Sequence, residues 1–455
     1  MSRLFGTDGV RGIANMAPMT AEMILEIGRA TAYVCKHRED HRHRIVIGKD
    51  TRLSGYMVEN ALTAGICSMG VDVYLVGPMP TPGIAFITQS MRADAGMVIS
   101  ASHNPYQDNG IKIFARDGYK LPDAVEDEIE ELIISGRIRE IRPTADQIGK
   151  AHRIEDASGR YIVFCKGTFP ADYSLEGTKI VIDCANGAGY RVAPLIFYEL
   201  GAEVVTIHTD PDGLNINAHC GSQYPEDLRA KVLEEGADAG FALDGDGDRV
   251  IAVDEKGGVL DGDHIIALCA RYYQQRGWLE PPRIVTTAMA NYGLLRALER
   301  MNIAYDVVTV GDRYVIEKMR ETGALIGGES SGHIIFHDHH TTGDGIVSAL
   351  QVLAAMQASG QPLSQLGRLV EKVPQKLVNV EVARRVPLEG IRRLQREIRD
   401  AETELSGRGR ILVRYSGTQP LCRVMVEADD EELADRISRQ IAEVVAAELS
   451  GRLEQ

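Results

Sequence analysis

The feature that most constrains the fold is a threefold internal repeat. Three segments begin alike, with a basic residue and then a short apolar run: 44–48 (RIVIG), 179–183 (KIVID) and 283–287 (RIVTT). Such runs are typical of buried strands. Each is followed by a stretch with helical spacing of apolar residues, at about 57–69, 190–200 and 292–301. The chain therefore repeats one α/β unit three times.

Each predicted helix is followed by a residue that favours the left-handed C-cap conformation, namely Gly70, Gly201 or Asn302. A second strand follows each cap. A final strand, preceded by small residues, closes each copy at 95–99, 239–243 and 323–326. Strands joined through a helix pair in parallel with right-handed crossovers. We therefore predict three repeated mixed α/β sandwich domains, each with a predominantly parallel sheet.

The chain beyond about residue 370 has a different pattern. It alternates strand-like and helix-like stretches, at 376–383, 389–404, 410–415, 422–428 and 430–448. This pattern predicts a small α+β domain. We expect four domains around a central cleft, with a hinge near 370–376, and place them at 1–155, 156–255, 256–370 and 371–455.

Composition excludes several classes of protein. The 455 residues are 44% hydrophobic and 25% charged, which is ordinary globular usage. The formal charge of −15 argues against nucleic acid as a partner. Seven cysteines without a C-x-x-C pair argue against a disulfide framework and a zinc site. No apolar run reaches membrane-spanning length, and the N-terminus lacks a signal peptide, so we expect a soluble cytoplasmic protein.

Polar loops follow the final strand of each repeat, at 100–105 (SASHNP), 244–249 (DGDGDR) and 327–333 (GGESSGH). Ligands of open α/β sheets bind beyond the carboxyl ends of the strands. Three equivalent domains thus place three different loops at equivalent positions. We predict that these loops converge on one cleft.

The second loop predicts a metal site. Asp244, Asp246 and Asp248 alternate with glycines, which let the main chain curl around an ion. Three close carboxylates repel one another unless a cation lies among them, and hard oxygen ligands suit Mg²⁺. Two alternatives are an acidic solvated turn and an EF-hand. The EF-hand would use Glu255 at position 12, but Arg249 stands at its glycine position.

Ser102 is the candidate nucleophile of the first loop, although the loop lacks a G-x-S-x-G elbow. The adjacent His103 is poorly placed to act as a base on its own neighbour. A serine that faces a Mg²⁺ loop suggests phosphoryl chemistry, with a phosphoserine oxygen on the metal. The ordinary alternative is a turn serine that caps a helix.

Three other positions carry candidate functional groups. Lys112, in the strand after the serine loop, could act as a general base if a cationic surrounding lowered its pKa, or could be a solvated lysine. Arg11 could brace a phosphate or merely pair with Asp8. The loop at 414–420 (RYSGTQP), with Arg423, could form an anion site. The histidines of segment 337–340 (HDHH) are interpreted as an exposed loop rather than metal ligands.

Taken together, the chain resembles the α-D-phosphohexomutase superfamily over its whole length. Four motifs in order carry the resemblance, one per domain: 100–105, 244–249, 328–333 and the loop that begins at Arg414. The opening segment 6–12 (GTDGVRG) is similar to the branch that acts on glucosamine phosphates.

The resemblance implies a role for each matching residue. Ser102 would be the phosphorylated catalytic serine, and it would bind Mg²⁺ together with Asp244, Asp246 and Asp248. Arg11 and Arg249 would stabilise the transferring phosphoryl group, and Lys112 and His333 would be the acid/base groups. The substrate-binding residues would be Glu329 and Ser331 for sugar hydroxyls, and Arg414, Ser416, Gly417, Thr418 and Arg423 for the distal phosphate.

Four positions depart from the superfamily pattern. Ser100 stands where Thr is usual, and Ser330 where Gln is common. Tyr415 replaces a Pro and Gln419 replaces a Glu in the last loop. Losing the Pro removes a fixed φ, and Gln419 removes a negative charge. Because the Arg and the Ser-Gly-Thr core remain, we expect phosphate binding to persist with altered affinity.

The implied activity is reversible exchange between glucosamine 6-phosphate and glucosamine 1-phosphate through a phosphoserine enzyme. One Mg²⁺ per chain and a glucosamine or glucose 1,6-bisphosphate primer would serve it. The product would supply UDP-N-acetylglucosamine synthesis for the cell envelope. The expected partner is a small phosphosugar, with no nucleic acid or membrane, and a homodimer is left open.

Three alternative functions remain at this point. The first is a phosphomannomutase/phosphoglucomutase of the same superfamily, which a substrate panel distinguishes. The second is a non-catalytic phosphosugar sensor, and the third is a Ca²⁺-binding module. Intact Ser102, Lys112 and metal-loop aspartates argue against the second.

Overall fold

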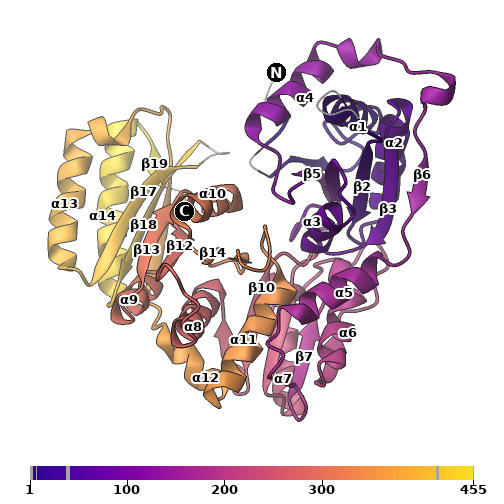
Figure 1. The fold of residues 1–455 in the computed structure, drawn as a ribbon. Helices are drawn as coiled ribbons and strands as arrows, with labels where there is room; N and C mark the ends of the chain where they lie inside the picture. Colours follow the sequence, from indigo (N-terminus) through magenta and orange to yellow (C-terminus); the bar gives the residue numbers. More distant parts are fainter. Residues whose placement is uncertain (1–3, 7, 37–40, 417–419, 454–455) are drawn as a thin grey trace. The chain divides into compact units, whose positions relative to one another are not determined.

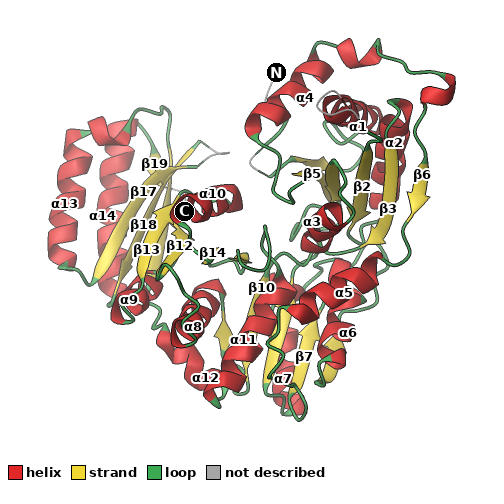
Figure 2. Cartoon of the chain, in the orientation of Figure 1, coloured by secondary structure: helices red, strands yellow, loops and turns green. Residues whose placement is uncertain are grey.

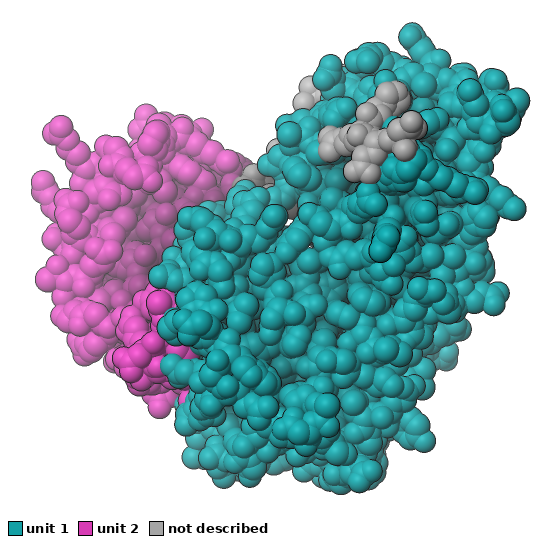
Figure 3. All heavy atoms as spheres, viewed as in Figure 1, with its two compact units in different colours: residues 1–287, 306–368 teal, residues 288–305, 369–455 magenta. Residues whose placement is uncertain are grey.

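The structure is a computed structural model that describes residues 4–6, 8–36, 41–416 and 420–453. The described chain forms two compact units (Figure 3). Unit 1 contains residues 1–287 and 306–368, and unit 2 contains residues 288–305 and 369–455. No helix among the described residues is long and apolar enough to cross a membrane.

The first sheet has the strand order β1-β5-β4-β2-β3-β6 (Figure 1). Its strands are β1 (Val10–Ile13), β2 (Arg44–Lys49), β3 (Asp72–Pro78), β4 (Ala95–Ile99), β5 (Asp108–Ala115) and β6 (Ala151–Arg153). Strands β2, β3, β4 and β6 pair in parallel, whereas β5 runs antiparallel to both β4 and β1. The first repeat therefore ends in a reversed strand.

Helices cover both faces of this sheet (Figure 2). They are α1 (Ala21–Lys36), α2 (Gly55–Ser68), α3 (Thr81–Ser90) and α4 (Asp123–Ile134). Successive side chains of a strand point to opposite faces. Ile45 and Ile47 accordingly pack in a core with α1, α2 and α4, whereas Val46 packs in a second core with α3.

The second sheet repeats the plan, with the order β11-β10-β9-β7-β8. Its strands are β7 (Lys179–Asp183), β8 (Glu203–Ile207), β9 (Ala239–Leu243), β10 (Val250–Asp254) and β11 (Val259–Leu260). Its helices are α5 (Ala157–Gly167), α6 (Val192–Glu199) and α7 (Glu226–Glu235). Strand β9 is parallel to β7, and β10 returns antiparallel to β9. The polar loop of this repeat joins β9 to β10.

The third sheet has the order β13-β12-β14-β15. Its strands are β12 (Arg283–Thr287), β13 (Ala304–Val308), β14 (Ile326–Gly328) and β15 (Ile334–Phe336). Its helices are α8 (Gly262–Gln275), α9 (Tyr292–Arg300), α10 (Asp312–Thr322), α11 (Gly345–Ser359) and α12 (Leu363–Leu366). Once more the last parallel strand, β14, is followed by a polar loop and an antiparallel strand, β15.

The C-terminal part of unit 2 is an antiparallel sheet with two helices. The strand order is β17-β18-β16-β19. The elements are β16 (Gln375–Glu381), α13 (Arg392–Leu405), β17 (Gly409–Tyr415), β18 (Leu421–Ala428), α14 (Glu431–Leu449) and β19 (Arg452–Leu453). Strand β18 pairs with both β16 and β17, and its buried face packs on α14.

The predicted fold class is confirmed: repeated, mostly parallel α/β domains precede a C-terminal α+β domain. The expected C-caps Gly70, Gly201 and Asn302 all have left-handed backbones, with φ of 83°, 100° and 56°. One boundary differs. The third copy's final strand begins at Ile326 and not at Gly323, because Gly323 is itself the left-handed cap of α10.

Candidate active site

The serine loop begins where β4 ends. Ser102 is fully buried and has a left-handed backbone with φ of 51°. Its hydroxyl donates a hydrogen bond to Asp244 Oδ2 at 2.6 Å, although the two residues belong to different repeats. The predicted meeting of the serine and aspartate loops is therefore confirmed.

His103 also reaches the serine. Its Nδ1 lies 3.3 Å from Ser102 Oγ, within hydrogen-bond distance, although we expected His103 to be poorly placed to act as a base on its neighbour. Burial, Arg249 and Arg11 lower the pKa of His103 to about 4. The imidazole is therefore neutral at pH 7.

The aspartate loop joins β9 to β10. Asp244, Asp246 and Asp248 are 1%, 1% and 5% exposed, so the solvated-turn interpretation is wrong. Strands flank the loop, which excludes an EF-hand. One carboxylate oxygen of each aspartate lies within 4.8 Å of the others. Gly247, with φ of 69°, allows the tight turn that brings them together.

The donor set suits a divalent cation. Among the described residues, none donates a hydrogen bond to the buried Oδ1 atoms of Asp246 and Asp248. Burial and its two neighbouring carboxylates raise the pKa of Asp244 well above its ordinary value. A hard cation would satisfy the open oxygen atoms and relieve this repulsion. The residues present therefore fit Mg²⁺.

Neighbouring residues hold the aspartate loop in place. Thr81, the first residue of α3, donates its hydroxyl to Asp246 Oδ2 at 2.7 Å and its amide to the Asp246 carbonyl at 2.8 Å. The amide of Gly345, at the start of α11, donates to the carbonyl of Gly247 at 3.0 Å. The metal loop is thus fixed by elements of the first and third repeats.

Lys112 lies among carboxylates rather than cations. Its Nζ is 2.9 Å from Asp246 Oδ2, 3.2 Å from Asp248 Oδ2 and 3.6 Å from Asp8 Oδ2. Burial would lower the pKa of Lys112, but the three carboxylates raise it well above its ordinary value. The expected lowering is therefore wrong, as is the solvated-lysine alternative, because the residue is 3% exposed. Lys112 is a buried cation.

Lys112 is one member of a charged ring, which we define as Lys112, Asp8, Lys120, Asp312, His333 and Asp248. Lys120 contacts Asp8 and lies 2.6 Å from Asp312 Oδ2. His333 closes the ring, with Nε2 3.7 Å from Asp312 Oδ2 and Nδ1 3.6 Å from Asp248 Oδ2. Opposite charges therefore alternate around the site when His333 is protonated.

The ring sets the charge of its own members. Burial would raise the pKa of Asp8, but Lys112, Lys120 and Arg11 hold it well below its usual range. Burial would lower the pKa of His333, but Asp248 and Asp312 raise it. Sequence reasoning missed Lys120 and Asp312. The position of Asp312 after Gly311, at the start of α10, was the available signal for one of them.

A pocket of ≈ 490 Å³ opens over the charged ring. Its lining is mostly polar and comes from all three repeats: Leu4, Gly6, Asp8, Gly9, Arg11, Asp248, Arg249, Val310, Gly311, Asp312, Glu329 and His333. A small polar ligand with negative charge suits this lining, since two arginines face it. The second and third polar loops line this pocket, whereas the serine loop lies behind it and meets the aspartate loop through the Ser102–Asp244 hydrogen bond.

The remaining predicted residues of unit 1 also lie here. Arg11 pairs with Asp8, as our simpler interpretation expected, and it still lines the pocket. Glu329 Oε1 accepts a hydrogen bond from the Gly311 amide at 3.0 Å, and Ser331 Oγ donates to Glu329 Oε2 at 3.5 Å. These two hydrogen bonds fix the orientation of the Glu329 carboxylate in the pocket wall.

Unit 2 carries a separate cluster of arginines. Arg414 and Arg423 lie opposite each other on β17 and β18. Burial and then Arg423 lower the pKa of Arg414. Arg385 donates to the carbonyl of the buried Ser416 at 2.8 Å. Gly417 and Thr418, predicted to bind the same phosphate, lie outside the described residues, as does Gln419.

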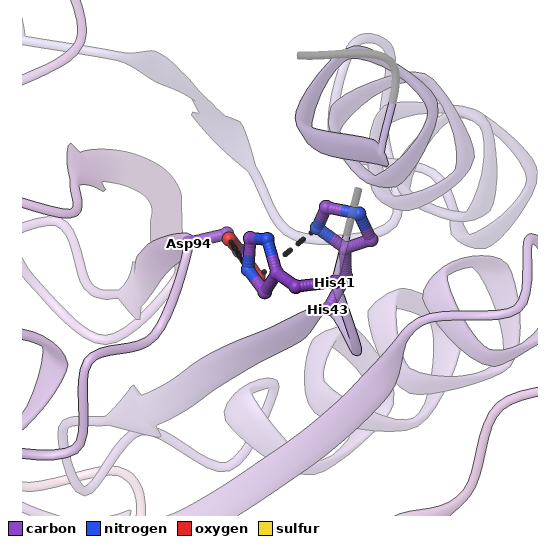
Figure 4. Close-up of side chains that lie close together, drawn as sticks. All are labelled: His41, His43 and Asp94. Carbon is purple, nitrogen blue, oxygen red and sulfur yellow. Dashed lines mark hydrogen bonds and ion pairs between the residues drawn. The ribbon is translucent and has the colours of Figure 1, made fainter. Parts of the chain in front are cut away.

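Two other clusters resemble metal sites but are explained by the fold. His41 and His43, which precede β2, lie together with Asp94, which precedes β4 (Figure 4). There Asp94 accepts the Arg44 amide at 2.8 Å and fixes the start of the strand. In the cluster of Asp183, His208 and Cys220, burial and nearby carboxylates raise the pKa of Cys220 to about 12, so the thiol keeps its proton.

The histidines of segment 337–340 do not gather around one point. His337 Nε2 lies 2.7 Å from the Tyr119 hydroxyl, and His339 Nε2 lies 3.1 Å from the Tyr273 hydroxyl. His340 Nε2 lies 3.0 Å from the Pro82 carbonyl. The interpretation of this segment as an exposed loop is wrong for His340, which is 5% exposed, and the three rings point to different partners.

Comparison with known proteins identifies the family. Four phosphoglucomutase/phosphomannomutase models match, alpha/beta/alpha domains I, II and III and the C-terminal domain, over residues 2–139, 160–258, 261–373 and 377–444. A phosphoglucosamine mutase of Syntrophus aciditrophicus is 60% identical over 449 residues, covering 99% of this chain and 100% of that protein. The chain belongs to the phosphoglucomutase/phosphomannomutase family. A phosphoglucosamine mutase of Citrifermentans bemidjiense is 58% identical, covering 99% of each chain.

Solved structures of the family share the fold. A phosphoglucomutase/phosphomannomutase family protein of Burkholderia thailandensis superposes with a TM-score of 0.81 at 25% identity, covering 98% of this chain and 97% of that one. An Aspergillus fumigatus N-acetylphosphoglucosamine mutase, solved with GlcNAc-6P and magnesium, gives 0.65 at 19% identity, covering 98% and 96%. The second likeness establishes the fold alone.

Two departures from the family pattern have a structural account. Ser100 keeps the hydroxyl of the usual Thr and uses it to accept the Ser102 amide at 2.9 Å. The hydroxyl of Tyr415 donates to the Val386 carbonyl at 2.8 Å and accepts the Val386 amide at 3.1 Å. These hydrogen bonds anchor the segment before the phosphate loop, where the family's usual Pro would restrict φ.

Proposed function

We propose that the chain is a phosphoglucosamine mutase. It interconverts glucosamine 6-phosphate and glucosamine 1-phosphate through phosphorylated Ser102 and glucosamine 1,6-bisphosphate. The observation that carries the proposal is the 2.6 Å hydrogen bond between Ser102 and Asp244, because Asp244 belongs to the loop whose Asp248 and Arg249 line the polar pocket. Curated phosphoglucosamine mutases 56–60% identical over almost the whole chain support this choice of substrate.

In the first half-reaction, the O1 hydroxyl of glucosamine 6-phosphate attacks the phosphorus of phosphoserine 102. The P–O bond to Ser102 breaks, the hydroxyl proton passes to a protein base, and Ser102 Oγ regains a proton. The bisphosphate then turns around. Its 6-phosphoryl group returns to Ser102, and glucosamine 1-phosphate leaves.

His333 and Lys112 are the proposed acid/base groups. His333 lines the pocket and is the better placed to exchange a proton with a sugar hydroxyl. Lys112, whose pKa is raised, is suited to donating a proton and to neutralising charge rather than to accepting a proton. Arg11 and Arg249 face the pocket and would stabilise charge on the transferring phosphoryl oxygens.

Asp244, Asp246, Asp248 and a phosphoserine oxygen would hold one Mg²⁺. When bound, the ion supplies charge neutralisation on the phosphoryl group. Glu329 and Ser331 would bind sugar hydroxyls. Arg414, Ser416, Gly417, Thr418 and Arg423 would hold whichever phosphate is not reacting. Each proposed domain, 1–155, 156–255, 256–370 and 371–455, contributes one loop, with a hinge near 370–376.

We expect the enzyme to work in the cytoplasm on small phosphosugars, to use glucosamine or glucose 1,6-bisphosphate as primer, and to supply UDP-N-acetylglucosamine synthesis for the cell envelope. A homodimer is left open.

A substrate panel tests the proposal. Purified protein with Mg²⁺ and bisphosphate primer should turn over glucosamine 6-phosphate with a higher kcat/KM than glucose or mannose phosphates. Intact mass should show one phosphate that maps to Ser102. Ser102→Ala should lose both the phosphate and turnover while its melting temperature stays near that of the wild type.

Three results would contradict it. Preference for glucose or mannose phosphates would favour a phosphomannomutase/phosphoglucomutase instead. Binding without turnover would favour a phosphosugar sensor, and a stable phosphate elsewhere would remove the nucleophile assignment.

A further inference from the structure

Arg52 is a completely buried arginine just beyond the carboxyl end of β2, with 0% exposure. Its guanidinium donates to the carbonyls of Ser102 and Asn104, each at 2.8 Å. It also donates to the carbonyl of Asp108 at 3.0 Å and to that of Pro105. One side chain thus holds four carbonyls of the segment 102–108, which is the serine loop and the start of β5.

A second set of hydrogen bonds connects Arg52 to the backbone amide of Ser102. Arg52 Nε donates to Asp50 Oδ2 at 2.7 Å, and Ser100 Oγ donates to that same oxygen at 2.6 Å. Ser100 Oγ in turn accepts the amide of Ser102 at 2.9 Å. Arg52 therefore fixes the carbonyl of Ser102 directly and its amide through Asp50 and Ser100.

These contacts counter a strained conformation. A non-glycine residue in the left-handed region costs free energy and persists only when its surroundings determine it. Ser102 has φ of 51°, and its carbonyl and amide are both held in this network. Releasing the network would let φ relax, which would swing Oγ away from the metal loop.

We propose that Arg52, acting with Asp50 and Ser100, is a positioning residue for phosphoryl transfer: it directs Ser102 Oγ toward the aspartate loop. The proposal rests on the proposed function of Ser102. Misplacing a reacting atom by about 1 Å costs on the order of 100-fold in rate. A residue that only stabilised the fold would leave the rate of a folded variant unchanged.

Two pairs of variants test the role. Arg52→Lys keeps the positive charge beside Asp50 but loses the planar fork that reaches several carbonyls. Its matched control is Arg29→Lys, because Arg29 is also buried in the first repeat and donates to a carbonyl, that of Ile141. Ser100→Ala removes the hydroxyl that links Asp50 to the Ser102 amide, and Ser100→Thr retains it.

The measurements are the single-turnover rate of Ser102 phosphorylation by glucose 1,6-bisphosphate, and kcat and KM for glucosamine 6-phosphate. We expect Arg52→Lys and Ser100→Ala to lower the transfer rate and kcat about 10- to 100-fold, with KM within about twofold. Ser100→Thr should restore most of the rate, and Arg29→Lys should match the wild type.

Wild-type transfer rates in folded Arg52→Lys or Ser100→Ala protein, judged by melting temperature, would overturn the positioning role alone. If Arg52→Lys does not fold, the Ser100 pair decides. Absence of Ser102 phosphorylation in the wild type would instead overturn the proposed function, so the two failures are distinct.

Discussion

His208 illustrates how the surroundings of a single residue set its charge. It follows β8, and its ring lies between two carboxylates, with Nδ1 3.1 Å from Asp183 Oδ1 and Nε2 3.3 Å from Asp227 Oδ2. The interaction with Asp183 raises the pKa of His208 above its ordinary value. Because the folded pKa exceeds the unfolded one, protonated His208 stabilises the fold at low pH.

We expect His208→Asn to destabilise the protein more at pH 6 than at pH 9. The stabilisation is fully present below the unfolded pKa of about 6.5 and is lost as pH rises through the folded pKa. Asn tolerates the left-handed backbone of this position, where φ is 50°. Urea unfolding at both pH values measures the difference.

The control is His219→Asn, since His219 shares the left-handed backbone, with φ of 55°, but packs on Tyr224. An equal loss of stability at pH 6 and pH 9 in His208→Asn would contradict the prediction.

Local patterns revealed some site residues but not others. Asp244, Asp246 and Asp248 form a spaced motif within one loop, so the sequence sufficed to predict their proximity. The partners of Lys120 lie 112 and 192 residues away, at Asp8 and Asp312. No local pattern marks such a pair, which is why Lys120 and Asp312, two of the six members of the charged ring, were missed.

Among the helices, α11 begins with a buried cap that joins two elements. Asp344 Oδ1 accepts the amides of Ile346 and Val347 at 2.9 and 3.0 Å, and Oδ2 accepts the hydroxyl of Tyr161 on α5 at 2.8 Å. Burial raises the pKa of Asp344 to about 6. The cap therefore connects the second and third repeats.

Replacing this cap should cost more than replacing an exposed one. Asp344→Ala removes the oxygen that accepts two amides and the oxygen that accepts a buried hydroxyl, so we expect a loss of about 2–4 kcal/mol in unfolding free energy. Asp430→Ala, at the exposed cap of α14, removes only amide acceptors and should cost about 1 kcal/mol.

Urea unfolding compares the two caps. In a Tyr161→Phe background the cost of Asp344→Ala should fall toward that of Asp430→Ala. Equal costs for the two caps in the wild-type background would contradict the argument.

Within the three repeats, the sequence predicted where several strands begin and where several helices end. Basic residues before apolar runs marked β2, β7 and β12, and small or amide C-caps marked the helix ends. The reversed strands β5, β10 and β15 were less predictable as a shared feature. The residues of an apolar run do not indicate whether the strand will pair parallel or antiparallel with its neighbour. That direction depends on the tight loop that precedes the strand.

Across the whole molecule, unit 1 brings three versions of one loop together. The shared topology predicted this convergence, because equivalent strands end at equivalent places. The individual contacts between the loops were not predictable, since they join residues of different repeats. Thr81 on Asp246, Ser102 on Asp244 and the bridge between Arg249 and His333 are examples.

Magnesium binding should stabilise the folded protein. A ligand at about 100 times its Kd adds about 2.7 kcal/mol to the unfolding free energy. We expect added Mg²⁺ to raise the melting temperature of the wild type by several degrees, and chelation to reverse the rise. Asp246→Asn should lose most of this response.

Asp254→Asn is the control for the metal test. Asp254 ends β10, at the opposite end of that strand from the aspartate loop, and accepts the amides of Lys256 and Gly258, each at 2.8 Å. This variant should keep the full response to Mg²⁺. If added Mg²⁺ left the melting temperature of the wild type unchanged, the prediction of a bound ion at the aspartate loop would be wrong.

The backbone twist at Ser102 restricts which alcohol can occupy the nucleophile position. A threonine would offer the same functional group, but its branched β-carbon tolerates a positive φ poorly. A cysteine would fit the turn but would offer a softer atom to a hard-ion site. The left-handed backbone conformation of residue 102 thus makes serine better suited to this position than threonine.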